Sequence, residues 1–450
     1  MTPPDRITPI VVWHNMVAGL TVSFVAISLG AAFGILSGRG AFAGIISAGI
    51  IAFITAAWGG TRVQTSGPTA PMTAVSAVVI AFAYDQLLAQ IPGADSEQFI
   101  DMVLILTGIA MVLMAVLRLG RFISYVPKVV VSGFMNGIAI LIWVDQLRKL
   151  TGLGGQTAFG GDHTANIMLA GVTFGLVMGL PYVIRRYARA VAGVLPATLL
   201  TIIGVTAVAN GLRLDVELVS LGTTLTSVAG LRAMVVSHIP TGWSTQMIML
   251  ALPFALQLAM LGYLDTLLTS LVVDKLNGEE TRKDKELVAQ GVANGAVAFV
   301  GGIPGAQATI RSVLILKEGA TLRLAGIMVG VFVLLEMLLF QQWISLIPNA
   351  VFAGLLFKVG WDVFDWLPVR RYTGARLDEV GLSSAWLRRP LDPPLTVTHT
   401  EVLFIAGTTA ATIVWDLNVA VIGFVTLFYL VGRFRPLRDL EIETAFGDEE

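Results

Sequence analysis

The chain has 450 residues and a formal net charge of −1 at pH 7. Hydrophobic residues make up 55% of it and charged residues only 13%, with a mean hydropathy of +0.80, whereas soluble domains carry about a quarter charged residues. This composition excludes an ordinary soluble domain and predicts an integral membrane protein, and the near-neutral charge argues against a nucleic-acid partner. Because the chain has no cysteine and only 4 scattered histidines, we expect no disulfide, thiolate nucleophile or His/Cys metal cluster.

Long apolar blocks follow one another along the chain and predict an all-α membrane protein. A helix of about 20 apolar residues crosses the hydrocarbon core and satisfies its own backbone polar groups there. Counting such blocks gives about fourteen transmembrane segments. They lie near residues 16–36, 41–58, 69–84, 99–117, 124–147, 167–184, 191–209, 245–275, 286–302, 306–318, 322–340, 344–365, 396–415 and 417–432.

The distribution of cations predicts the orientation of these segments. Most of the 29 Lys and Arg residues fall in loops and tails that lie on one side of the membrane when the segments alternate. Cytoplasmic loops carry such an excess, so both termini are expected in the cytoplasm. The sequence therefore predicts a multi-pass protein of a bacterial inner (plasma) membrane, with membrane lipids as its surroundings.

A long outer loop at 211–244 divides the chain into two halves, 15–210 and 245–432. Each half holds about seven segments, and an odd number gives the two halves opposite topologies. Such inverted repeats are typical of secondary transporters. The two ends, 1–14 and 433–450, are expected to be short cytoplasmic tails.

The third segment of each half is interrupted at the same place. Gly59 and Gly60 precede TRVQTSGPTAPMTAV, and Gly301 and Gly302 precede IPGAQATIRSV. Non-helical backbone at membrane depth is tolerated where it is buried in protein or lines a cavity, and matched interruptions indicate a substrate site. We therefore expect half-helices in segments three and ten that begin near the membrane centre. The alternative is a pair of ordinary proline kinks between packed helices.

The starts of these half-helices form the predicted binding site, because free N–H groups and the helix dipole favour an anion there. The candidate anion-binding residues are Thr69, Thr73, Gln307, Ala308, Thr309 and Arg311. A buried cation needs a partner at membrane depth. The guanidinium of Arg311 could attract the anion, pair with Asp265, or do both.

Asp265 lies late in the eighth segment, and Thr269 follows one turn further on the same helix face. Ionisable residues in membrane helices are candidate functional sites. The two side chains could bind Na⁺ as a coupling ion, or Asp265 could carry a coupling proton or pair with a cation. The alternative places Asp265 near the cytoplasmic end, where water solvates it. No other metal and no cofactor are expected.

A series of motifs in order resembles the SulP family of anion transporters. These motifs are GGTRVQTSGPTAPMTAV, VPKVVVSGFMNGIAILI, LDTLLTSLVVDKL, KDKELVAQGVANGAVAFVGGIPGAQATIRSV and AVFAGLLFKVGWDVFDW. The resemblance extends from about residue 15 to residue 432. Among family members, the sequence is most similar to the sodium-dependent bicarbonate transporters of cyanobacteria.

The resemblance implies a core domain of segments one to four and eight to eleven, and a gate domain of the other segments. It implies an anion held by Thr69 and the backbone around Ala308 and Thr309, a sodium-holding role for Asp265 and Thr269, an elevator-type motion and a homodimer. The sequence departs from the bicarbonate transporters at Arg311, where they have a small residue, and a cation there would compete with sodium. We also expect no STAS domain after the last segment, where most members carry one.

We therefore predict a secondary active transporter of a small inorganic anion, bicarbonate first and sulfate second. Na⁺, H⁺ or anion exchange would drive it, since the sequence has no G-x-x-x-x-G-K-[ST] signature for ATP. The chain shows no catalytic cluster and is not expected to be an enzyme. One alternative is a nucleobase transporter of the same architecture, although that family usually has a carboxylate in segment ten, where this chain has Gln307 and Arg311. Another is an uncoupled anion channel.

Overall fold

The computed structural model describes residues 8–153, 158–187, 197–219, 228–379, 397, 399–414 and 417–434. These residues are mostly helical, as the sequence predicts. Residues 1–7 and 435–450 of the predicted tails, and residues 220–227 of the predicted outer loop, lie outside the described residues.

The chain forms two compact units, one of Met1–Ile123 and Val144–Lys358 and one of Ser124–Trp143 and Val359–Glu450. The helices of the first unit are α1 (Pro9–Ser37), α2 (Ala41–Trp58), α3 (Ala70–Asp85), α4 (Leu87–Gln90), α5 (Ser96–Val116), α7 (His163–Tyr187), α9 (Ala197–Gly211), α10 (Val228–Ser237), α11 (Thr245–Asn277), α12 (Lys283–Ala298), α13 (Thr309–Lys317) and α14 (Arg323–Ile344). Those of the second are α16 (Trp366–Glu379), α17 (His399–Val414) and α18 (Leu417–Phe434). The boundary between the units falls within η1 (Leu119–Tyr125), α6 (Lys128–Thr151) and α15 (Asn349–Val363).

Among the described helices, 7 are long and apolar enough to cross a membrane by length and composition: α1, α2, α5, α6, α7, α11 and α14. Shorter apolar helices include α3, α9 and α17. The count of about fourteen segments and their inverted repeats stay predictions. The predicted outer loop contains a helix of its own, α10, which the sequence analysis did not anticipate.

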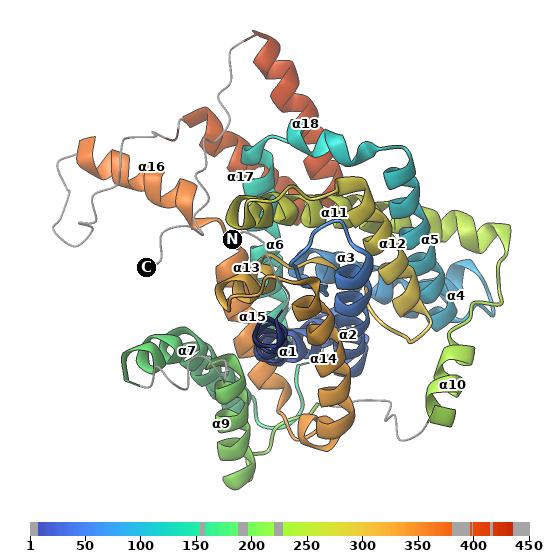
Figure 1. Ribbon diagram of the computed structural model, residues 1–450, viewed down its shortest axis with the longest axis vertical. Helices are drawn as coiled ribbons and strands as arrows, with labels where there is room; N and C mark the ends of the chain where they lie inside the picture. The colour runs from blue at the N-terminus through green and yellow to red at the C-terminus, as the bar shows by residue number, and fades with distance from the viewer. Residues whose placement is uncertain are drawn as a thin grey trace. The chain divides into compact units, whose positions relative to one another are not determined.

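Small residues bring the helices of the first unit close together. Helices α1, α2 and α14 pack on one another, and α5 packs on α11 and α12 (Figure 1). A Cβ atom added to Gly44 would lie 1.9 Å from the carbonyl oxygen of Gly30, and one added to Gly291 would lie 2.6 Å from that of Gly108. Such contacts between α1 and α2 and between α5 and α12 are typical of membrane helices, where packing and not water expulsion holds helices together.

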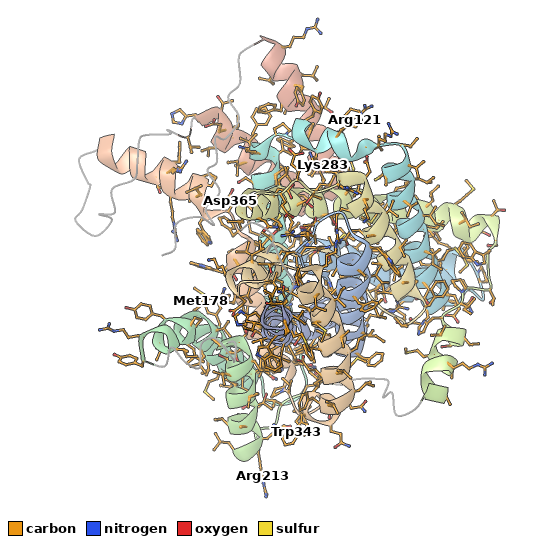
Figure 2. The ribbon with its side chains drawn as sticks, in the orientation of Figure 1. Arg121, Met178, Arg213, Lys283, Trp343 and Asp365 are labelled. Carbon is orange, nitrogen blue, oxygen red and sulfur yellow. The ribbon has the colours of Figure 1, made fainter. Side chains whose placement is uncertain are left out.

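The C-terminal ends of α9 and α14 lie side by side at one end of the first unit. The side-chain amide of Asn210 donates a hydrogen bond of 3.0 Å to the carbonyl of Leu346. Figure 2 labels Arg213 and Trp343 at this end, where Trp343 is 69% exposed. Tryptophan and arginine at the ends of apolar helices are typical of a membrane–water interface.

The second unit is smaller. Helix α17 packs on α18, with the rings of Phe404 and Phe428 5.5 Å apart, and the hydroxyl of Thr409 donates to the carbonyl of Gly133 at 2.9 Å. Helices α7 and α9, which the resemblance assigns to a gate domain, belong to the first unit, where α9 contacts α1. The division into core and gate domains stays a prediction.

Candidate functional site

The two interrupted segments meet in a short antiparallel ribbon, although a long stretch of sequence separates them. Strand β1 (Ser66–Gly67) pairs with β2 (Ala306–Gln307), with Ser66 opposite Gln307 and Gly67 opposite Ala306. The amide of Ala308 extends the ribbon by donating to the carbonyl of Thr65 at 3.0 Å. Because each strand leads directly into a helix, the ribbon holds the starts of α3 and α13 near each other.

Both helix starts leave their first N–H groups without a side-chain cap. Thr69 is the N-cap of α3 and has extended backbone angles (φ −124°, ψ 158°), and Pro71 lies in the first turn. Ala308 is the N-cap of α13, and its methyl group has no acceptor atom. By contrast, Ser244 caps α11 through its hydroxyl oxygen. Uncapped N–H groups and the positive end of the helix dipole favour an anion at both starts.

Helix α11 supplies hydrogen-bond partners for both half-helices. The hydroxyl of Thr69 donates to Oδ2 of Asp265 at 2.6 Å, and the hydroxyls of Thr269 and Thr309 are 2.6 Å apart. One turn of α11 thus contacts the start of α3, and the next turn contacts the start of α13. Among the described residues there is no group of three or more acidic or histidine side chains that could hold a metal ion, so a cation here would rely on one carboxylate and hydroxyl oxygens.

Gln307 is held from the same helix. Its side-chain carbonyl accepts a 2.6 Å hydrogen bond from Ser270, and its backbone N–H donates to the hydroxyl of Thr266 at 3.4 Å. The side-chain Nε2 of Gln307 is buried and has no hydrogen-bond partner in the described part of the chain. This orientation leaves a buried amide donor next to the start of α13.

Arg311 lies in the first turn of α13 and is only 1% exposed. Its Nη2 donates to the carbonyl of Pro68 at 3.0 Å, whereas its Nε and Nη1 have no hydrogen-bond partner among the described residues. No ion pair joins Arg311 to Asp265, although the structure describes both side chains. A Cβ atom added to Gly67 would lie 2.9 Å from Nη2 of Arg311, so the guanidinium packs directly against this glycine.

The candidate residues from the sequence therefore lie in β2, at and after the starts of α3 and α13, and on α11, around one ribbon. The structure brings Thr69 to Asp265 and Thr269 to Thr309. Thr73 is buried one turn into α3, and its hydroxyl has no hydrogen-bond partner among the described residues. Whether any of these residues binds an anion or a coupling ion stays a prediction.

The sequence analysis missed several residues that build this site. The carbonyl of Pro68 and the hydroxyl of Ser270 hold Arg311 and Gln307, yet neither residue carries a charge that would draw notice. Three further polar residues lie on α12: Glu286, Gln290 and Asn294. Their spacing of four residues in a segment expected to cross the membrane was a signal that could have identified them.

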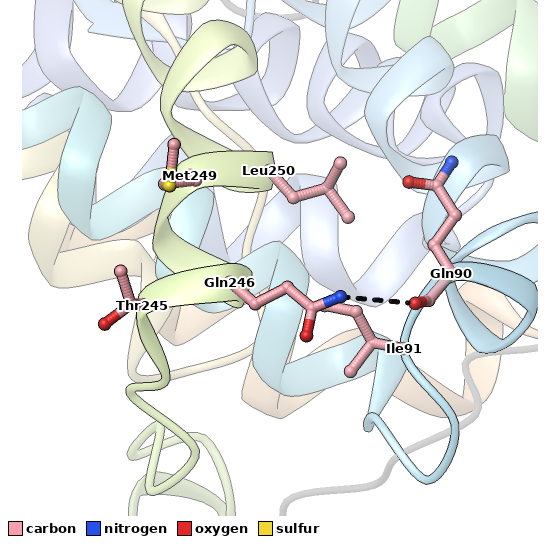
Figure 3. Close-up of a pocket in the computed structure, with 6 residues that line it drawn as sticks. All are labelled: Gln90, Ile91, Thr245, Gln246, Met249 and Leu250. Carbon is pink, nitrogen blue, oxygen red and sulfur yellow. Dashed lines mark hydrogen bonds between the residues drawn. The ribbon is translucent and has the colours of Figure 1, made fainter.

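A separate cavity of about 540 Å³ lies near the start of α11 (Figure 3). It is lined by Gln90, Ile91, Thr245, Gln246, Met249 and Leu250, and the side-chain amide of Gln246 donates to the carbonyl of Gln90 at 3.4 Å. Asp265 lies about 30 Å further along α11, given the rise per residue of a helix. The cavity is therefore distinct from the ribbon site.

Comparison with known proteins agrees with this architecture. Residues 12–378 match the model of the Sulfate permease family. The chain is 32% identical over 363 residues to the bicarbonate transporter BicA of Picosynechococcus, which covers 79% of this chain and 62% of that protein. It is 29% identical over 416 residues to the putative sulfate transporter YvdB of Bacillus subtilis, covering 90% of this chain and 71% of that protein.

Two solved structures share the fold of this chain. The transmembrane domain of a cyanobacterial BicA superposes with a TM-score of 0.71 at 28% identity, covering 92% of this chain and 98% of that domain. The murine anion transporter Slc26a9, in an inward-facing state, has a TM-score of 0.73 at 15% identity and covers 97% of this chain, which supports the fold alone.

Together, the fold and the ribbon site define a multi-pass helical membrane protein that shares its fold with a transporter domain and in which α3 and α13 start at one place. Within that class, the chain belongs to the Sulfate permease (SulP) family. It spans only 62% of the length of the BicA relative.

Proposed function

We propose that the protein is a secondary active transporter of a small inorganic anion, which binds between the starts of α3 and α13. One observation carries the proposal: the guanidinium of Arg311 is buried beside two uncapped helix starts, with its Nε and Nη1 unpartnered in the described structure. A buried cation with unused donors calls for an acceptor, and the free N–H groups nearby favour a negatively charged one. The side-chain Nε2 of Gln307 adds a further free donor.

Bicarbonate is the first substrate to consider and sulfate the second. Relatives named as bicarbonate transporters and as putative sulfate transporters both match this chain over most of its length. Both anions present several oxygen acceptors, which suits a site composed of N–H donors. Alternating access by an elevator-type motion, a homodimer, and an inner-membrane location with cytoplasmic termini complete the proposal.

Asp265 is the proposed coupling group. It lies on α11 and accepts a hydrogen bond from Thr69, so a change in its charge acts directly on the start of α3. Binding of Na⁺ or H⁺ at Asp265 would link the ion gradient to anion binding, and anion exchange is the alternative drive. The fixed positive charge of Arg311 in the same site disfavours the addition of any second positive charge at Asp265, Na⁺ or H⁺, by Coulomb repulsion, which favours anion exchange.

Radiolabelled uptake into proteoliposomes tests the proposal. Bicarbonate and sulfate are supplied separately under a Na⁺ gradient, a pH gradient, or an outward gradient of the same anion, with protein-free liposomes as the control. We expect saturable uptake of at least one anion and accumulation under one of the gradients. Uptake of neither anion, or saturable uptake of uracil or xanthine in their place, would contradict the substrate assignment.

An uncoupled channel is the second candidate, because the site needs only its donors to bind an anion. Electrophysiology on planar bilayers separates the two functions. A transporter is expected to give no resolvable unitary currents, whereas a channel gives discrete anion currents that follow voltage without a coupled ion.

A further inference from the structure

Three polar residues of α12 lie on one face of that helix: Glu286, Gln290 and Asn294. We refer to them as the α12 polar stripe. Each has a relative exposure of 0%, so none of them is solvated at the protein surface. Buried polar side chains are costly unless they are hydrogen-bonded, so their partners indicate what they hold.

The first two residues of the stripe hold the segment that leads into β1. Glu286 accepts 3.0 Å hydrogen bonds from the backbone N–H of Thr61 through Oε2 and from the side-chain amide of Gln64 through Oε1. The amide of Gln290 donates to the hydroxyl of Ser66 at 2.7 Å and to Oε1 of Glu286 at 3.0 Å. The hydroxyl of Ser66 in turn donates to the side-chain carbonyl of Gln64 at 2.7 Å. The segment from Thr61 to Ser66, which we call the first lead because it leads through β1 into α3, is therefore attached to α12 at several points.

The third residue of the stripe, Asn294, holds Gly305, which directly precedes β2. We call this segment before β2 the second lead. The side-chain amide of Asn294 donates to the carbonyl of Gly305 at 2.9 Å, and its Oδ1 accepts from the N–H of Gly305 at 2.8 Å. One side chain thus satisfies both backbone groups of a residue that immediately precedes β2. Gly305 also packs on β1, because an added Cβ atom would lie 2.3 Å from the carbonyl oxygen of Gly67.

The helix that carries the stripe is itself firmly packed. The contact of Gly291 with Gly108 brings α12 against α5 with no room for a side chain. The other hydrogen bonds of the stripe stay within α12 or reach Met111 on α5, whose Sδ accepts from the side-chain amide of Asn294 at 3.7 Å, and no hydrogen bond of the stripe reaches Arg311 or Asp265. The stripe therefore acts on the anion site through the ribbon and not by direct contact with Arg311 or Asp265.

We propose that the α12 polar stripe sets the separation of the two anion-binding helix starts, and that its members are positioning residues for transport. Since both leads are attached to one helix, the starts of α3 and α13 move as one body and Arg311 keeps its contact with Pro68. The proposed effect of the stripe on transport rests on the proposed function. Its proposed effect on the separation of the two helix starts is independent of that function.

A distance measurement tests the geometry. Because the chain has no cysteine, spin labels can be attached only at introduced positions, and Val78→Cys on α3 and Lys317→Cys on α13 are both at exposed residues. In the labelled wild type we expect one narrow distance distribution by pulsed electron paramagnetic resonance. Asn294→Ala and Gln290→Ala are each expected to broaden or shift it.

Asn166→Ala is the matched control for this distance measurement and for the uptake measurement described next. The buried amide of Asn166 on α7 also donates to a backbone carbonyl, that of Gly160, at 3.0 Å, but it lies outside the ribbon. This variant loses a similar hydrogen bond and is expected to leave the distance distribution unchanged. If Asn294→Ala does not fold, Gln290→Ala carries the test, because it leaves the Gly305 contact intact.

Anion uptake tests the effect on transport. We expect KM for the transported anion to rise about three- to tenfold in Asn294→Ala, with wild-type KM in Asn166→Ala. A purely structural role would lower the thermal stability and the maximal rate at unchanged KM, and that result would overturn the positioning role. An unchanged distance distribution in both stripe variants would overturn the geometry even if uptake is observed. If no anion is transported, the proposed function fails, and the distance measurement still decides the geometry.

Discussion

The starts of α3 and α13 have similar backbones and different chemistry. Each follows one strand of the β1–β2 ribbon and begins without a side-chain cap. At the start of α3, Thr69 bonds to Asp265 and Pro68 offers a carbonyl acceptor, whereas the start of α13 carries the buried donors of Arg311 and Gln307. We propose that the shared backbone gives both starts a general preference for anions, and that the side chains place anion binding mainly at the start of α13 and ion coupling at the start of α3, through its contact with Asp265.

Arg311→Ala should have the largest effect, because it removes the only buried cation in the described part of this site. We expect kcat/KM for anion uptake to fall at least about 30-fold, since losing one partner of a buried charged contact costs about 2–5 kcal/mol. Radiolabelled uptake measures the loss. Arg213→Ala, at the exposed Arg213, is the control. An unchanged KM together with a lower melting temperature would show that the guanidinium only supports the structure.

Asp265→Asn should abolish ion coupling, the role proposed for the contact between Asp265 and the start of α3. The amide keeps an oxygen for the hydroxyl of Thr69, so we expect a folded protein, but it can carry neither a negative charge nor a coupling proton. Accumulation driven by a Na⁺ or pH gradient should disappear. The control is Asp85→Asn at the exposed end of α3. Gradient-driven accumulation at the wild-type rate in Asp265→Asn would exclude Asp265 from coupling.

Gly67→Ala should disturb the contact between the two starts. Gly67 has φ +151°, and an added Cβ atom would lie 2.9 Å from Nη2 of Arg311. We expect a rise in KM of several-fold and a loss of about 1–3 kcal/mol of stability from backbone strain. Uptake and thermal unfolding measure the two effects.

Gly93→Ala is the matched control for Gly67→Ala. Gly93 also has positive φ, at +81°, but nothing lies within 4 Å of an added Cβ atom. It should lose stability without any change in KM. An equal KM in both variants would contradict a functional contact between Gly67 and the guanidinium.

Thr69→Val and Thr309→Val should give the smallest effects and sharpen the comparison. Each removes one hydroxyl, from the contact with Asp265 or with Thr269, and should cost about 0.5–1.5 kcal/mol of stability. Thr69→Val is expected to change the ion dependence of uptake, and Thr309→Val to change mainly KM. Uptake at varied Na⁺ and pH measures this, and identical ion dependence in the two variants would contradict the assignment of coupling to α3.

The places where the half-helices begin followed closely from the sequence. The interrupted segments predicted helix starts near Thr69 and Ala306. The structure begins α3 at Ala70, next to the predicted start, whereas Ala306 and Gln307 form β2 and α13 begins at Thr309. Glycine and proline are local signals, because glycine widens the backbone freedom at its own position and proline restricts it and removes an N–H donor. Local signals of this kind can be read without knowing which other segments lie nearby.

The hydrogen-bond partners of Arg311 could not be predicted from such local signals. The sequence left open an ion pair with Asp265, whereas the structure gives the Pro68 carbonyl as its hydrogen-bond partner and joins Asp265 to Thr69. Similarly, the regular spacing of Glu286, Gln290 and Asn294 was visible, but not the residues that they hold. Helix α10 was missed because its 10 residues are too short to stand out as a membrane segment.

The sequence by itself determined the membrane class, the family, the paired interruptions and the short list of polar residues around them. These features depend on composition and on the local behaviour of glycine, proline and charge. Only the tertiary structure decided that the two leads form a ribbon with Ser66 opposite Gln307, and that α12 holds both of them. Pairings between distant segments depend on how the intervening helices pack, and that packing is a property of the whole unit.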